Sequence, residues 1–447
     1  MSTEPVRVAV LGGGMFFEEI IGQTLKDFTL GGIAGALNSI GMSRLAPEVA
    51  GIPVHLVAVC TNSPGHGTAD RIAADFNRQV PGASVTAHYG QEGWQEILKT
   101  TEPEVLFVAV PDHLHAPAIL QALAHGVHVI AEKPLCLHTA EADRIIAEAE
   151  ERGLVVAVDM HKRYDPFVRE LMTRSIRRYG EIVRIRAVLE EPLEVSTDVF
   201  AWAEESDPFA YVGCHWLDVV SHYTGAFPRA VYATGERKLL EHWDDVQREI
   251  AARTGRTDFK RTGRIHTWDS MNVNVTYDNG MRGDFNNTWI NPADFEGAVN
   301  QEIEVIGTLG RGMVDQQDRG LREAITGEGS RTRNPAFGAR VETPEGGVEL
   351  FGYGKASIAA GLLAILRVLR LGASISDVEG TYPDAKSQRP VTMVIEAARS
   401  VAARNYEHFQ GRGAAPVTAA LTPDSIRLID PFGDPIEHSI YCREPGR

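Results

Sequence analysis

The stretch from Val105 to Pro134 constrains the fold more than any other part of the chain. It reads as an apolar strand, a loop that contains Pro111, a helix that ends at Gly126, a second apolar strand and the charged sequence Glu132-Lys133-Pro134. Two apolar strands joined by one helix lie side by side in parallel, because the crossover helix returns the chain to the same edge of the sheet. The sequence therefore predicts a parallel sheet with helices on both faces.

The same alternation fills the first 160 residues. Strands are predicted at 6–11, 55–60, 85–88, 105–110, 127–131 and 154–158, with helical patterns between them. This order is typical of a doubly wound α/β sheet, so we expect a Rossmann domain over residues 1–160. From Ile182 onward apolar and polar residues alternate, which predicts antiparallel strands with one covered face. Residues 161–447 are therefore expected to form an α+β domain with a large open, mainly antiparallel sheet.

The composition excludes several classes of protein. The 447-residue chain has a net charge of −16 and no basic stripe, which argues against nucleic acid or an anionic membrane as a partner. No apolar run reaches the ~20 residues of a membrane helix, and the first strand begins too early for a signal peptide. The four cysteines are scattered without metal-binding spacing, so we expect free thiols, no metal and a cytoplasmic protein.

A dinucleotide site is predicted where the first strand ends. Gly12 and Gly14 match the first two glycines of the G-x-G-x-x-G turn, in which phosphate rests on the N-terminus of the following helix. Phe17 stands at the third position and is expected to push the first helix away from the strand. The candidate cofactor-binding residues here are Gly12, Gly14, Met15 and Phe16.

The end of the second strand bears on the choice of dinucleotide. An NAD site places an acid there to bind the ribose hydroxyls, but this strand runs into Thr61 and Asn62. The missing carboxylate leaves room for the 2′-phosphate of NADP, although no basic residue follows closely and Arg71 lies on the next helix. The expected cofactor is therefore NAD or NADP, with Thr61 and Asn62 in contact with it.

Three segments fit neither pattern. Residues 23–51 are rich in glycine and small apolar residues, and they form either an insertion near the cofactor or a subunit contact, or a lengthened helix and loop. Residues 240–268 and 312–348 are polar and charged, and we expect both to be flexible excursions.

Four motifs in this order resemble the glucose–fructose oxidoreductase and inositol dehydrogenase family (Gfo/Idh/MocA). They are the glycine turn, the loop with Pro111 and His115, Glu132-Lys133-Pro134, and the G-x-H-x-x-D sequence of Gly213–Asp218. The resemblance covers nearly the whole chain and implies hydride transfer between a nicotinamide and a carbohydrate or cyclitol. It implies that Lys133 lies beside the reacting hydroxyl and that His215 accepts the proton. The residues then expected to contact the cofactor are Pro111, His115, Glu132 and Lys133.

The third catalytic position departs from the family pattern. The family has an aspartate four residues before this histidine, whereas the residue here is Tyr211. A tyrosine at this place is able to donate a hydrogen bond or a proton to the substrate oxygen, and Asp207 is the alternative carboxylate.

The chemistry of alcohol oxidation agrees with these roles. A base must take the hydroxyl proton as hydride leaves, and histidine, with an ordinary pKa near ~6.5, suits this task near neutral pH. An ammonium group beside the oxygen stabilises the developing alkoxide, most strongly in a dry pocket. Lys133 is therefore predicted to be catalytic, and a plain ion pair with Glu132 is the alternative.

Four further residues are candidates for substrate binding. His161 and Arg163 leave the last parallel strand, and Asp218 lies one helical turn after His215. Trp289 ends a sheet strand, where it is placed to stack on a sugar ring. The alternatives are a basic turn at a domain boundary for the first two and core packing for Trp289.

The sequence thus predicts an NAD(P)-dependent dehydrogenase or reductase that acts on a sugar, glycoside or cyclitol. The alternative on the same scaffold is a glycosidase that holds NAD, oxidises the sugar transiently and cleaves by elimination, which Tyr211 and the three unassigned segments leave open. The open sheet face predicts a homodimer or homotetramer.

Overall fold

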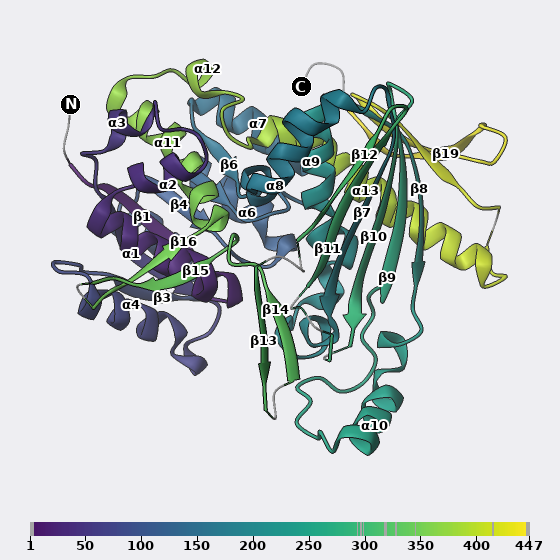
Figure 1. Cartoon of the computed structure of the whole chain (residues 1–447), viewed down its shortest axis with the longest axis horizontal. Helices are drawn as coiled ribbons and strands as arrows, with labels where there is room; N and C mark the ends of the chain where they lie inside the picture. Colours follow the sequence, from purple (N-terminus) through teal and green to yellow (C-terminus); the bar gives the residue numbers. More distant parts are fainter. Residues whose placement is uncertain are drawn as a thin grey trace. The chain divides into compact units, whose positions relative to one another are not determined.

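The computed structural model describes residues 4–443 except 293, 296, 298, 317–319, 327, 328, 345 and 414. The chain divides into two compact units, whose elements are labelled in Figure 1. The first unit comprises residues 1–136, 141–166 and 335–388, and the second comprises 137–140, 167–334 and 389–447. The first unit thus includes 335–388, a segment that the sequence analysis grouped with the second domain.

The first unit is built on the predicted parallel sheet. Its strands lie in the order β3-β2-β1-β4-β5-β6. The order reverses between β1 and β4, and the carboxyl ends of the strands at such a reversal are where ligands bind in open α/β sheets. The strands are β1 (Val6–Leu11), β2 (Val54–Thr61), β3 (Thr86–Tyr89), β4 (Val105–Val108), β5 (His128–Ala131) and β6 (Val156–Val158).

Apolar helices build the larger core around this sheet. The most deeply buried is α11 (Tyr353–Leu371), which comes from the segment that returns late in the chain. Gly361 lets α11 approach β6 closely, since a Cβ there would lie 3.1 Å from the Cβ of Ala157. Eight further α-helices have the following bounds: α1 (Gly22–Gly31), α2 (Ala34–Ser39), α3 (Ala46–Val49), α4 (Thr68–Gln79), α5 (Gly90–Thr100), α6 (His115–Ala124), α7 (Thr139–Arg152) and α12 (Ile375–Val378).

Residues 23–51 form a lengthened helix followed by two short helices. A π-helical turn at Phe17–Ile21 runs directly into α1, and apolar side chains of α1, α2 and α3 enter the core. Phe17 is buried against Gly22, where a Cβ would lie 3.0 Å from Phe17 Cε1. The absence of a side chain at Gly22 thus leaves room for the Phe17 ring, and the displacement of the first helix from the strand stays a prediction.

The second unit carries the predicted mainly antiparallel sheet. β7 and β10 run parallel, and the other neighbours for which a register is defined run antiparallel. Alternation holds along β9, where Met271 and Val273 are buried and Asn272 and Asn274 are exposed. Across the sheet the strands are β12 (Arg311–Asp315), β11 (Asn300–Gly307), β7 (Ile182–Pro192), β10 (Arg282–Asn291), β9 (Ser270–Tyr277), β8 (Pro228–Glu236), β17 (Thr418–Thr422), β18 (Ser425–Ile429) and β19 (Pro435–Cys442).

Two longer helices accompany this sheet. α9 (Cys214–Thr224) packs on β7, where Trp216 Nε1 donates a hydrogen bond to Val188 O at 2.9 Å. α13 (Ala385–Phe409) is tied to β8 by Asn405, whose Nδ2 donates to Ala233 O at 2.9 Å.

Residues 240–268 fold into a helix with a core of its own, so the prediction of a flexible excursion is wrong. The helix is α10 (Trp243–Thr254), and the side chains of Leu240 and Trp243 are fully buried. Ile290, near the end of β10, packs against them. Burial of these apolar side chains stabilises the segment in spite of its many charges.

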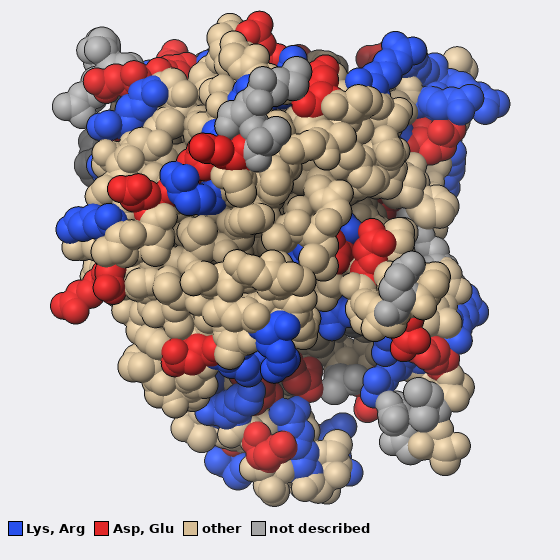
Figure 2. Space-filling view, turned by 90° about the vertical axis from the view of Figure 1, so that its left-hand side faces the viewer, with Lys and Arg blue, Asp and Glu red and all other residues tan. Residues whose placement is uncertain are grey.

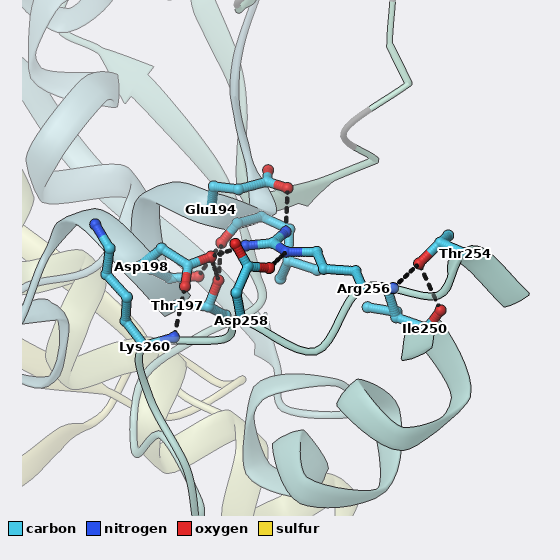
Figure 3. Close-up of polar contacts among 10 residues, drawn as sticks. Glu194, Thr197, Asp198, Ile250, Thr254, Arg256, Asp258 and Lys260 are labelled. Atoms are coloured by element: carbon cyan, nitrogen blue, oxygen red, sulfur yellow. Dashed lines mark hydrogen bonds and ion pairs between the residues drawn. The ribbon is translucent and has the colours of Figure 1, made fainter. Parts of the chain in front are cut away.

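An ion-pair cluster fastens this segment to the turn that follows β7 (Figure 3). Arg256 lies at the centre, with Nη2 2.7 Å from Asp198 Oδ2, Nη1 3.0 Å from Glu194 Oε1 and Nε 3.2 Å from Asp258 Oδ1. The backbone N–H of Lys260 donates to Asp198 Oδ1 at 2.9 Å. Because the Asp198 side chain is only 7% exposed, its pair with Arg256 is better shielded from solvent than a surface pair.

The described residues of 312–348 also form strands rather than a flexible excursion. β13 (Leu321–Ile325) pairs with β14 (Gly329–Arg333), and β15 (Ala339–Glu342) pairs with β16 (Val348–Phe351). Parts of this prediction, at 317–319, 327, 328 and 345, lie outside the described residues.

Candidate active site

The glycine turn after β1 contains one position that only glycine fits and one that is open. Gly12 has a φ of +110°, and a Cβ there would lie 1.9 Å from the carbonyl oxygen of Ala109, so only glycine fits. Gly14 is different, because a Cβ there would meet no protein atom within 4 Å. The protein itself therefore does not require a glycine at position 14, whereas a ligand that approaches the backbone would.

Met15 and Phe16 follow this turn at the start of the first helix. Met15 is exposed, and the ring of Phe16 stacks on His161 with a centroid distance of 6.0 Å. Phe337 and Tyr353, from the returning segment, complete this aromatic cluster at 5.0 and 5.9 Å from His161. The sequence analysis missed both, because their only signal is aromatic character far along the chain.

Thr61 and Asn62 lie at the end of β2. Asn62 is exposed, whereas Thr61 Oγ1 is buried and makes no hydrogen bond within the described residues. The one cation considered for a 2′-phosphate, Arg71, forms an ion pair with Glu18 on the first helix. A ribose hydroxyl is a suitable partner for the buried Thr61 oxygen.

The loops after β4 and β5 are joined by His115. Its Nδ1 lies 2.6 Å from Pro134 O, and its Nε2 lies 2.8 Å from Val110 O, directly before Pro111. Complete burial lowers the pKa of His115, although both carbonyls and Asp112 oppose this shift. His115 therefore holds the Pro111 loop and the Glu132-Lys133-Pro134 loop together.

Lys133 is buried at the carboxyl end of β5. The residue is 7% exposed, and its charge acts on Glu132 and on a second buried acid, Asp159, which follows β6. Burial raises the pKa of Glu132 well above its usual range, and the charge of Asp159 adds to this effect. Burial also lowers the pKa of His161 strongly, with Lys162 and Lys133 adding to the shift, so His161 is neutral at physiological pH. The sequence analysis did not single out Asp159 as a site residue. The signal that could have found it is an acid directly after a buried strand.

Arg163 is buried after β6, in the 3₁₀ turn His161–Tyr164. Its Nη2 lies 3.4 Å from Ser387 Oγ, also in the first unit. Its predicted contact with a substrate stays a prediction.

In the second unit, Tyr211, His215 and Asp218 lie on successive turns of one helical segment. A π-helical stretch, Phe209–Gly213, leads into α9, and His215 and Asp218 are buried. Gly213 allows close contact with β10, because a Cβ there would lie 2.7 Å from Asn287 Oδ1. The predicted catalytic histidine is thus held on a helix packed directly on the sheet.

Tyr211 is half-buried in an aromatic cluster. Its ring lies 4.9 Å from that of Phe200, 5.9 Å from Trp202 and 6.1 Å from Trp289, each edge to face. Trp289 is fully buried, so stacking on a sugar ring requires this cluster to open.

Asp207, the alternative carboxylate, is already engaged. It accepts the N–H of Ala210 at 2.8 Å and pairs with Arg399 at 2.9 Å, so it caps the helical segment.

On the face in Figure 2, basic side chains are interspersed with acidic ones, unlike the continuous basic surface of a nucleic-acid-binding protein. Among the described residues, no cluster of three or more His, Cys, Asp or Glu has the arrangement of a metal site. Within the same part of the chain, no helix has both the length and the apolar character needed to cross a bilayer.

Family models match parts of both units. Residues 174–312 match the Gfo/Idh/MocA C-terminal domain. The chain is 29% identical over 148 residues to trans-1,2-dihydrobenzene-1,2-diol dehydrogenase of Bos taurus, covering 32% of this chain and 44% of that protein. It is 31% identical over 181 residues to dTDP-3,4-didehydro-2,6-dideoxy-alpha-D-glucose 3-reductase of Streptomyces violaceoruber, covering 40% and 48%. The matches thus span about half the length of these curated relatives.

Solved structures share the fold at lower identity. GenD2 from gentamicin A biosynthesis, in complex with NAD, matches with a TM-score of 0.60 at 20% identity, covering 90% of this chain and 95% of that one. An inositol dehydrogenase homologue from Azotobacter vinelandii, complexed with NADH and myo-inositol, matches with a TM-score of 0.59 at 16% identity, covering 90% and 96%. Residues 6–160 match the family model described as the oxidoreductase family with an NAD-binding Rossmann fold. Together with the C-terminal match, this shows that the chain belongs to the Gfo/Idh/MocA family of oxidoreductases.

Proposed function

We propose that the protein transfers hydride between a nicotinamide cofactor and a hydroxyl or keto carbon of a sugar or cyclitol. Membership of an oxidoreductase family supports this reaction class, and relatives named for dTDP-sugar and inositol chemistry support the substrate class. The observation that carries the proposal is the buried Lys133 at the carboxyl end of β5, in the same unit as the open Gly14 turn.

The residues of the first unit suit an NAD-type dinucleotide. The open space at Gly14 accepts a phosphate on the helix N-terminus, and the unpaired Thr61 oxygen accepts a ribose hydroxyl. Since Arg71 is paired with Glu18, we favour NAD over NADP. When bound, the nicotinamide supplies the acceptor or donor of the hydride.

Each remaining role belongs to a residue of this chain. The Lys133 ammonium holds the reacting oxygen and stabilises negative charge on it. His215 takes the hydroxyl proton in oxidation and returns it in reduction. Asp218 orients His215 or binds the substrate. Tyr211 donates a hydrogen bond to the substrate oxygen.

The test is turnover with NAD and with NADP against a panel of sugars, glycosides and inositols, with reduced nicotinamide and products followed together. Lys133→Met is expected to lower the rate about 10²- to 10³-fold while the dissociation constant of the dinucleotide changes little. A variant that keeps most of its rate removes Lys133 from the mechanism. Glycoside cleavage without net reduction of the cofactor would instead establish the redox-assisted glycosidase.

A further inference from the structure

Two buried carboxyl groups lie next to Lys133 and have no role in the chemistry proposed above. Glu132 directly follows β5, and Asp159 directly follows β6. These strands are parallel neighbours in which Ala131 pairs with Val158, so the strand register places the two acids side by side. Their side chains are 7% and 3% exposed.

The hydrogen bonding of this pair is incomplete if both groups are ionised. Glu132 Oε1 and both carboxylate oxygens of Asp159 are buried and receive no hydrogen bond from an N–H or O–H donor. The Ser357 hydroxyl on α11 is near enough to Asp159 to lower the pKa of this carboxyl, but its single proton is donated to Gly354 O at 2.8 Å. The two carboxyls are within hydrogen-bonding reach of each other. One proton held between them supplies the missing contact, since buried polar atoms are nearly always hydrogen-bonded.

The surrounding charges are consistent with a single proton. Burial raises the pKa of both carboxyls, that of Asp159 to about 6. Hydrogen bonding from Ser357 and with Glu132 opposes the shift of Asp159, and Lys133 opposes both shifts. A pair with one proton carries one negative charge, which balances the single positive charge of Lys133. Other charged or titratable groups that act on Lys133 and its neighbours include Asp112, His115, His161 and Lys162.

We propose that Glu132 and Asp159 share one proton and together act as a single negative charge that positions Lys133. Two ionised carboxylates would place two negative charges beside the ammonium group, and two neutral carboxyls would place none there. Asp159 is thus a positioning residue that acts through Glu132. The importance of this positioning for catalysis rests on the proposed function, but the presence of a shared proton is independent of it.

Unfolding as a function of pH tests the shared proton without any substrate. Because the pair holds protons in the folded state that it loses in the unfolded state, its contribution to stability falls as pH rises from about 4 past 6. Asp159→Asn removes the part of this dependence that Asp159 contributes. The Tm of the variant minus that of the wild type should therefore increase by about 5 °C between pH 4 and 8. Glu132→Gln should have a similar effect, and the double variant should add little to either.

Asp269→Asn is the matched control. Asp269 is an equally buried acid, but it accepts the backbone N–H groups of Lys238, Leu239 and Leu240. Its replacement should lower the Tm at neutral pH, because three backbone N–H groups lose their charged acceptor. If the curves of Tm against pH for the wild type and Asp159→Asn run parallel, the shared proton is refuted.

The effect on Lys133 is read by NMR of ¹³C-labelled lysine, with the Lys133 resonance assigned by its loss in Lys133→Met. In the wild type this resonance should shift between about pH 5 and 7, as the pair takes up its second proton. It should stay constant in Asp159→Asn over the same range. A shift that persists in that variant refutes the positioning role. Neither measurement needs turnover. Both therefore test the shared proton even if the protein does not catalyse the proposed reaction.

Discussion

The substitution Arg256→Gln tests whether the ion-pair cluster or the small apolar core stabilises the folded conformation of residues 240–268. The pair with Asp198 is the larger contribution, because that carboxylate is only 7% exposed, and a hydrogen bond between charged groups contributes about 1.5–3 kcal/mol. In the pair with Glu194, the Arg256 side chain is 32% exposed and the Glu194 side chain 29%. This more solvated pair adds about 0.5 kcal/mol. In the variant Asp198 still accepts the backbone N–H of Lys260, so its carboxylate keeps one hydrogen bond. The expected loss in stability of the segment is therefore near the lower end of this range, at about 2 kcal/mol.

Amide hydrogen exchange of α10 measures this loss directly. If the segment opens about 2 kcal/mol more easily, its protected amides exchange about 30-fold faster. Arg253→Gln is the control, because Arg253 on the same helix pairs with Glu249 and both side chains are mostly exposed. That substitution should change exchange by less than about fivefold. Equal exchange in the two variants would refute the cluster as the fastening and leave the buried Leu240 and Trp243 as its basis.

Three further outcomes are expected. Gly14→Ala should unfold like the wild type but bind dinucleotide more weakly in a titration, whereas Gly12→Ala should destabilise the first unit itself in thermal unfolding, because its Cβ meets backbone. Lys355→Met should lower the free energy of unfolding in urea by about 3–5 kcal/mol, since it leaves Asp27 buried without the cation 2.7 Å away. His128 accepts a hydrogen bond from backbone, and burial lowers its pKa to about 4, so stability should fall by about 3 kcal/mol as pH drops from about 6.5 to 4. Thermal unfolding of His128→Gln, whose side chain also accepts a hydrogen bond, should show a smaller loss over this range.

The parts of the fold that follow from local patterns were predictable. The apolar strands around Val105–Pro134 gave the parallel sheet, and the alternation after Ile182 gave the antiparallel one. The same patterns placed Gly12 and Lys133 at the carboxyl ends of β1 and β5.

Features that depend on long-range packing were not predictable in this way. Trp243, Val246 and Ile250 have helical spacing, but the surrounding charges concealed it. The burial of Asp159 depends on which strand lies beside β6, and the burial of Trp289 depends on aromatic neighbours distant in sequence.

The return of α11 to the first unit has a consequence for how the chain is made. Synthesis runs from the N-terminus, so β1 to β6 leave the ribosome long before the helix that completes their core. Until then the nascent sheet exposes the apolar surface around Ile130 and Ala157 that Gly361 later covers. A fragment that ends at Pro166 would keep this surface open and is expected to aggregate, even though it contains every strand of the dinucleotide-binding sheet.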